Sequence, residues 1–66
     1  MKVYLNSKEI ELENNSNLLL LLEQSNIIKP GIAVAVNNFV IPKLQWDNCL
    51  LNDNDKITII KAVSGG

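Results

Sequence analysis

A single leucine run limits what this chain can fold into. Residues 18–22 are five consecutive leucines, and they follow a polar cluster at residues 14–17. The run alone has no periodicity and would also suit a buried strand. Leucine costs little in a helix, no β-branched residue interrupts the run, and the preceding residues are of the types that cap a first turn. We therefore predict a helix here, capped by Ser16 or Asn17.

The predicted helix has one clear apolar face. Leu18, Leu21 and Leu22 share a stripe at the i, i+3, i+4 spacing and are expected to pack on a sheet. Leu19 and Leu20 then point sideways or outward, where they either cover the flanks of the core or contact a partner.

The other apolar segments resemble half-buried strands, because apolar residues alternate along much of their length. They are residues 2–6, 9–13, 32–36, 39–41 and 56–61. Turn residues join the first two segments into a hairpin, with the glutamates of the second strand facing outward. Asn37-Asn38 joins the third segment to the fourth, because asparagine tolerates positive φ. The expected order is strand, strand, helix, strand, short strand, strand.

The stretch after the fourth strand is ambiguous. Residues 43–47 suit a short 3₁₀ or irregular segment that carries Trp46 to the rim of the core, and residues 49–51 suit a short strand or a loop. Cys49 is the one thiol, and it is either a sulfur or redox relay or a small apolar residue of the core. Residues 52–55 predict a turn; they lack the glycine and distal glutamate of a calcium loop.

Length and composition set further limits. One helix on one face of a mixed sheet of four or five strands is a two-layer α+β arrangement. The 66 residues allow one small domain, expected at residues 1–62, and a single cysteine allows no internal disulfide. No cluster has metal-ligand spacing, so we expect no bound metal.

The charge balance and the missing residue types narrow the function. A net charge of −1 without a basic run argues against nucleic-acid binding, and the longest apolar run is too short for a membrane span. The chain has no histidine, which removes Ser-His and Cys-His nucleophile pairs. We expect a cytoplasmic protein that is a substrate or carrier rather than a catalyst.

The C-terminal Gly-Gly is the candidate reactive end. Neither Gly65 nor Gly66 has a Cβ, so the backbone can enter a slot too narrow for a side chain. The Gly66 carboxylate becomes an acyl donor only after activation, for which adenylation by ATP is the expected route. Val63 and Ser64 complete a mobile tail at residues 63–66 that would thread through a partner's channel.

A docking patch is expected next to this tail. Thr58, Ile60 and Ala62 fall on the face of the last strand that points away from the core. Isolated surface apolar residues are also normal, so an ordinary solvent-exposed face is the alternative.

The chain resembles the small sulfur carrier proteins of thiamine thiazole biosynthesis. The segments that match are Val3-Tyr4-Leu5-Asn6, Leu21-Leu22-Glu23, Val34-Ala35-Val36-Asn37-Asn38, Val40-Ile41-Pro42, Trp46, Asp53-x-Asp55 and Gly65-Gly66. The resemblance implies a ubiquitin-like β-grasp fold in which the first and last strands are central and parallel. One departure is Asn54, where the family often has glycine; asparagine also tolerates the left-handed region.

The resemblance also implies a chemistry. An adenylating enzyme related to ubiquitin-activating enzymes would adenylate Gly66, using its own ATP, so the carrier itself holds no stable cofactor. With a sulfur-donating enzyme the adenylate becomes a thiocarboxylate, whose sulfur passes to thiazole synthase. Three alternatives are the small subunit of molybdopterin synthase, a ubiquitin-like protein modifier, and an interaction domain with an incidental Gly-Gly.

Overall fold

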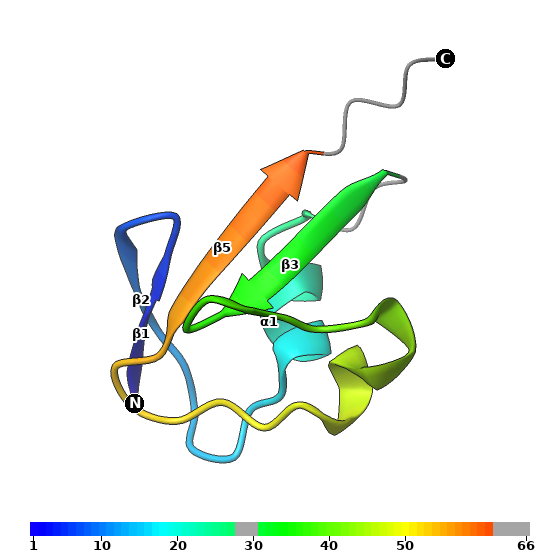
Figure 1. Ribbon diagram of the computed structural model, residues 1–66. Coiled ribbons are helices and arrows are strands. Elements are labelled where there is room, and N and C mark those ends of the chain that lie inside the picture. Colours follow the sequence, from blue (N-terminus) through cyan, green and yellow to red (C-terminus); the bar gives the residue numbers. More distant parts are fainter. Residues whose placement is uncertain (28–30, 62–66) are drawn as a thin grey trace.

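The computed structural model describes residues 1–27 and 31–61, which form two layers, a twisted sheet and a helix behind it (Figure 1). The elements are β1 (Lys2–Leu5), β2 (Lys8–Glu11), α1 (Leu18–Gln24), β3 (Ile32–Val36), β4 (Phe39–Val40), the 3₁₀ helix η1 (Lys43–Asn48) and β5 (Lys56–Lys61). This is the predicted order, and the bounds of β3 and β5 are those expected from the alternation.

The described strands form one five-stranded mixed sheet in the order β2-β1-β5-β3-β4. β1 lies antiparallel to β2 and parallel to β5, while β3 lies antiparallel to both β4 and β5. The first and last strands are therefore neighbours inside the sheet. This parallel pair, which the resemblance implied and the periodicity did not, is confirmed.

The register separates a core face from an open face. Leu5 pairs with Ile57, and both side chains are buried beneath the helix. Tyr4 pairs with Lys56, and these two side chains belong to the opposite face. Because side chains alternate along a strand, Thr58 and Ile60 lie on the same open face as Lys56, as predicted.

Helix α1 supplies the second layer through the predicted leucine stripe. Leu18, Leu21 and Leu22 are fully buried, whereas Leu20 keeps 40% of its surface exposed. Of the two candidate caps, the structure selects Asn17, whose Oδ1 accepts a hydrogen bond from the Leu20 N–H at 2.8 Å. The preceding residue serves a different purpose, since Ser16 donates to the Glu13 carbonyl at 2.7 Å.

Asparagine provides most of the left-handed backbone conformations. The non-glycine residues with positive φ are Asn6, Ser7, Asn15, Asn26, Asn37, Asn38 and Asn54. Asn37 and Asn38 have φ of 51° and 73°, so they form the predicted two-residue turn between β3 and β4. Asn54 has φ of 71°, which confirms that asparagine serves where the family often has glycine.

The ambiguous stretch forms a 3₁₀ helix and a loop, and it contributes one aromatic side chain to the core. Residues 43–48 form η1, and Trp46 is 3% exposed, so it lies in the core rather than at its rim. Its indole N–H donates to the Ile41 carbonyl at 2.9 Å, which satisfies the buried ring nitrogen. Residues 49–51 form no strand; one isolated bridge joins Asn17 and Leu50. Strand β4 ends at Val40, one residue earlier than predicted.

Candidate functional site

The described part of the site is the strand that leads into the C-terminal tail. β5 carries the chain to Lys61 between β1 and β3, and its C-terminal end extends past the β1–β2 hairpin (Figure 1). The predicted reactive residue Gly66 lies outside the described residues, as do Val63, Ser64, Gly65 and Ala62. The division into a domain at 1–62 and a tail at 63–66 therefore stays a prediction.

The beginning of β5 is fixed by an asparagine of the β3–β4 turn. The Asn37 N–H donates to the Lys56 carbonyl at 2.8 Å, and the Lys56 N–H donates to Asn37 Oδ1 at 3.0 Å. Asn37 Nδ2 also donates to Asp55 Oδ1 at 2.9 Å. Asn37 thus extends the hydrogen-bond ladder between β3 and β5 by one residue beyond the end of β3, and it fixes the position of the first residue of β5.

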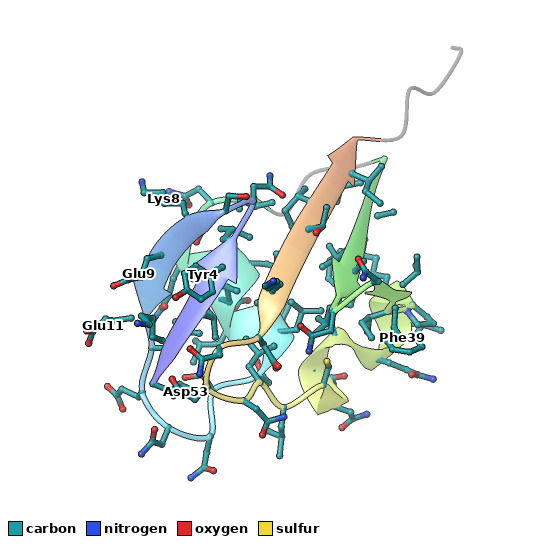
Figure 2. The ribbon with its side chains drawn as sticks, turned by 60° about the vertical axis from the view of Figure 1, so that its left-hand side comes forward. Tyr4, Lys8, Glu9, Glu11, Phe39 and Asp53 are labelled. Atoms are coloured by element: carbon teal, nitrogen blue, oxygen red, sulfur yellow. The ribbon has the colours of Figure 1, made fainter. Side chains whose placement is uncertain are left out.

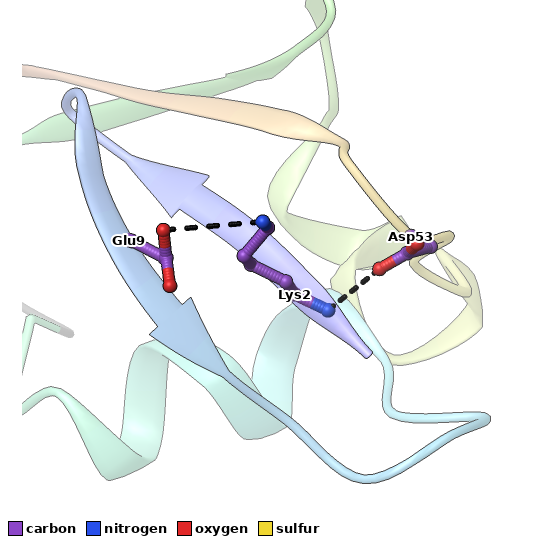
Figure 3. A network of polar contacts seen from close by, with 3 residues as sticks. All are labelled: Lys2, Glu9 and Asp53. Atoms are coloured by element: carbon purple, nitrogen blue, oxygen red, sulfur yellow. Dashed lines mark hydrogen bonds and ion pairs between the residues drawn. The ribbon is translucent and has the colours of Figure 1, made fainter.

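The acidic turn before β5 ties the last strand to the first. The Lys2 N–H donates to Asp53 Oδ1 at 2.7 Å (Figure 3). The Asn54 N–H donates to the Lys2 carbonyl at 2.6 Å. The Lys2 ammonium lies 4.0 Å from Glu9 on β2. Tyr4 first, and then Glu9, raises the pKa of this exposed lysine above its ordinary value. Residues 53 and 54 form a turn, as predicted, and the Asp53 side chain also ties this turn to β1, a contact that the sequence did not predict.

Asn6 holds the middle of β5. Its N–H donates to the Ile57 carbonyl at 2.9 Å, and its Oδ1 accepts from the Ile59 N–H at 2.9 Å. β1 ends at Leu5, so the Asn6 side chain supplies the next bond of the ladder where the strand itself has stopped. The sequence did not predict this role, because Asn6 is a typical turn residue and its partners on β5 lie far away in the chain.

The open face of the sheet is charged on the β2 side and more apolar on the side of β5, β3 and β4. Glu9 and Glu11 lie on the β2 side, where Figure 2 shows them pointing away from the fold, and both are exposed. Toward the other side, the β5 residues Thr58 and Ile60 are exposed, and Ile60 shows 46% of its surface. Their register partners on β3 are alanines, and Val40 on β4 is 63% exposed. An apolar half of the face thus adjoins the end of β5.

Two of the three predicted patch residues are therefore placed as expected. Thr58 and Ile60 share the open face near the end of β5, opposite Ala35 and Ala33. Ile60 lies opposite the small residue Ala33 and keeps almost half of its surface exposed, so its apolar side chain is accessible to another protein.

Cys49 does not have the environment of a reactive thiol. Its side chain is half-buried beside the core. Burial, and after it the negative charge of Asp55, raises the pKa of the thiol. The nucleophilic thiolate is thereby disfavoured at neutral pH. The core interpretation fits this setting better than a sulfur relay.

The described surface offers no assembled catalytic site. A depression of about 260 Å³ is lined by Tyr4, Ser7, Lys56 and Ile57, but no hydrogen bond links the described side chains of Ser7 and Lys56. Residues 1–27 and 31–61 contain no group of three or more side chains suited to hold a metal ion. None of the helices in this part of the chain is long and apolar enough to cross a membrane.

Comparison with known proteins assigns this chain, over almost its full length, to one protein family. The family model of the ThiS family matches residues 2–66. The sulfur carrier protein ThiS of Escherichia coli is 27% identical over 66 residues, covering 100% of both chains. The uncharacterized protein ycf40 of Trieres chinensis is 32% identical over 63 residues, which is 96% of this chain and 86% of that protein.

Solved structures support the same fold. The crystal structure of a thiamine biosynthesis protein (ThiS) from Geobacter metallireducens superposes with a TM-score of 0.86 at 20% identity, over 100% of each chain. A solution NMR structure of a thiamine biosynthesis protein from the same organism gives 0.75 at 20% identity, over 100% of this chain and 88% of that one. The β-grasp fold predicted from the sequence is confirmed.

Proposed function

Because this chain belongs to the ThiS family, we propose that it is a sulfur carrier protein of thiamine biosynthesis whose Gly66 carboxylate bears the sulfur. The observation that carries the proposal is the family match from residue 2 to residue 66, which includes the Gly-Gly end. The fold supports it, since β5 is fixed on both sides at its start and leads directly toward the tail.

The proposed chemistry begins with an adenylating enzyme. A Gly66 carboxylate oxygen attacks the α-phosphorus of ATP, pyrophosphate leaves, and an acyl-adenylate forms. Sulfur at the oxidation level of sulfide, delivered by a sulfur-donating enzyme, then attacks the acyl carbon as HS− and AMP leaves, which produces the thiocarboxylate without a further reductant. Thiazole synthase transfers the sulfur, at the level of sulfide, to its substrate, and water supplies the oxygen atom that restores the carboxylate for another cycle. The carrier needs no cofactor of its own, because ATP is bound by the activating enzyme.

In this proposal the open face of the sheet is the surface that binds the activating enzyme. Thr58 and Ile60 contact the activating enzyme on the open face, together with Ala62, while Val63, Ser64 and Gly65 lie in its channel. The glutamates of β2 form the opposite, solvated side of that face. All steps take place in the cytoplasm, where ATP and reduced sulfur are both present.

Intact-protein mass spectrometry after co-expression with the neighbouring pathway enzymes tests the proposal. We expect a species heavier by the exchange of one oxygen for sulfur, and deletion of Gly66 should abolish it. Trp46 fluorescence shows whether the truncated chain is still folded, because this residue is buried in the core. A folded truncated protein that still gains sulfur would contradict the assignment. Attachment to larger proteins would instead indicate a ubiquitin-like modifier.

A further inference from the structure

β5 is an interior strand over its first half and an edge strand over its second half. On one side β3 accompanies it to the end, through the pair Ile32 and Lys61. On the other side the pairing with β1 stops at Leu5 and Ile57. Figure 1 shows β5 and β3 continuing together beyond the β1–β2 hairpin. Apart from the Asn6 side chain, no described residue pairs with β5 on this side after Ile57.

The hydrogen bonds of Asn6 show which backbone groups face this free edge. The Ile57 carbonyl and the Ile59 N–H both point toward β1, because they bond to Asn6. Backbone groups of alternate residues point to the same side of a strand. The Ile59 carbonyl and the Lys61 N–H therefore also point to this side, beyond the reach of β1. They form a ready donor and acceptor pair for an additional strand.

The other two edges of the described sheet are protected from strand addition. Along β2, Lys8, Glu9 and Glu11 are exposed and charged (Figure 2), a pattern that discourages pairing with another chain. β4 is only two residues long, and Pro42 follows shortly after it. Residues 59–61 of β5 contain no proline and one charged residue, Lys61, whereas β2 has three.

We propose that an extended segment of the activating enzyme adds to this free edge as a further strand, bonding to the Ile59 carbonyl and the Lys61 N–H. The inference rests on the proposed function and specifies how the partner holds the carrier. The edge is continuous with the tail, so a strand paired here fixes the chain immediately before the residues that enter the channel. Main-chain hydrogen bonds supply the affinity in this binding mode, and the open-face side chain of Ile60 supplies specificity.

Amide hydrogen exchange measured by NMR, with and without the activating enzyme, tests this directly. In the free protein the Lys61 amide should exchange rapidly, while the Thr58 and Ile60 amides, which face β3, are protected. Binding of the enzyme should slow exchange at Lys61 at least about tenfold. Unchanged exchange at Lys61 in a complex that forms would overturn the inference. Slow, concentration-dependent exchange without the enzyme would also overturn it, because a second copy would then occupy the edge.

A matched pair of variants provides the functional arm. Lys61→Pro removes the outward N–H but no bond to β3, whereas Lys61→Ala keeps the N–H and loses only the side chain. Adenylation kcat/KM should fall about fivefold further for Lys61→Pro than for Lys61→Ala, the loss expected for one backbone hydrogen bond. Equal values for two folded variants would refute strand addition. If the wild-type protein itself is not adenylated, the proposed function fails instead, so the two failures are distinguishable.

Discussion

Asn37 donates from its side-chain amide to the Asp55 carboxylate at 2.9 Å, a bond between the β3–β4 turn and the residue that precedes β5. Asp55 is buried, with 8% of its surface exposed, and its second oxygen accepts from the Asn52 N–H at 2.8 Å. Asn37 also bonds to both backbone groups of Lys56, because its N–H donates to the Lys56 carbonyl and its Oδ1 accepts from the Lys56 N–H. The start of the central strand therefore depends on one small polar cluster.

Asn37→Gly should destabilise the protein by about 1–3 kcal/mol, because Asp55 loses a partner in a buried position. Glycine retains the positive φ, so the turn itself is not strained by the change. Asn38→Gly is the matched control, since it occupies the same turn at positive φ and no described hydrogen bond involves its side chain. Urea unfolding should show little change for the control. Equal losses for both variants would mean that turn geometry, not the cluster, provides the stability.

Leu22→Ala should cost about 2–5 kcal/mol, the range for removing a buried leucine side chain. Leu22 is 0% exposed on the face of α1 that packs on the sheet. Leu20→Ala makes the same chemical change at a position that is 40% exposed, and should cost less than about 1 kcal/mol. Chemical denaturation followed by Trp46 fluorescence measures both. A similar loss at the two positions would argue against the observed helix orientation.

Ile60→Asp should raise the KM for adenylation about tenfold while leaving the fold intact, because a charge replaces an exposed apolar side chain at the proposed docking surface. Leu44→Asp is the control: Leu44 is 91% exposed, lies on η1 and lines a groove with Leu19 of α1, away from the open face. Pyrophosphate exchange kinetics should show little change for that variant. If both substitutions act equally, the effect reflects overall charge rather than a local patch.

Cys49 should react slowly with alkylating reagents at neutral pH. The pH at which its alkylation rate reaches half of the maximum should be higher than for a free cysteine. Its pKa is raised in the folded protein, first by burial and then by the charge of Asp55. The folded state thus holds the thiol proton more tightly than the unfolded state. The associated stability is fully present below the unfolded pKa and is lost as pH rises through the folded pKa. Alkaline denaturation curves should show this loss for the wild-type protein and not for Cys49→Ala.

The local elements were predictable because their signals lie within a few residues. The alternation at residues 32–36 and 56–61 reproduces the bounds of β3 and β5, and the leucine spacing identifies the buried stripe of α1. The strands predicted at residues 2–6 and 39–41 each end one residue earlier, and the strand predicted at residues 9–13 lies at residues 8–11. The structure of residues 43–51 could not be settled from the sequence, because the depth of Trp46 depends on packing between η1 and α1, which lie far apart in the chain.

The site was predictable only in part. The outward face of β5 follows from alternation, so Thr58 and Ile60 were identified correctly as exposed. The pairing of β1 with β5 has no local signal, because it joins opposite ends of the sequence; it came from the resemblance alone. The hydrogen bond between Asn6 and Ile59 depends on that pairing, because the two residues are 53 positions apart. The sequence around Asn6 indicates only a turn, so this contact was not predicted.

The parallel alignment of β1 and β5 has a practical result for anyone handling this protein. Strands that run in the same direction start at one pole of the sheet and finish at the other, so Met1 and the end of β5 lie at opposite poles (Figure 1). A purification tag or fluorophore fused ahead of Met1 is thereby kept away from the enzymes that we propose act at the far end. The same label fused behind β5 would obstruct them.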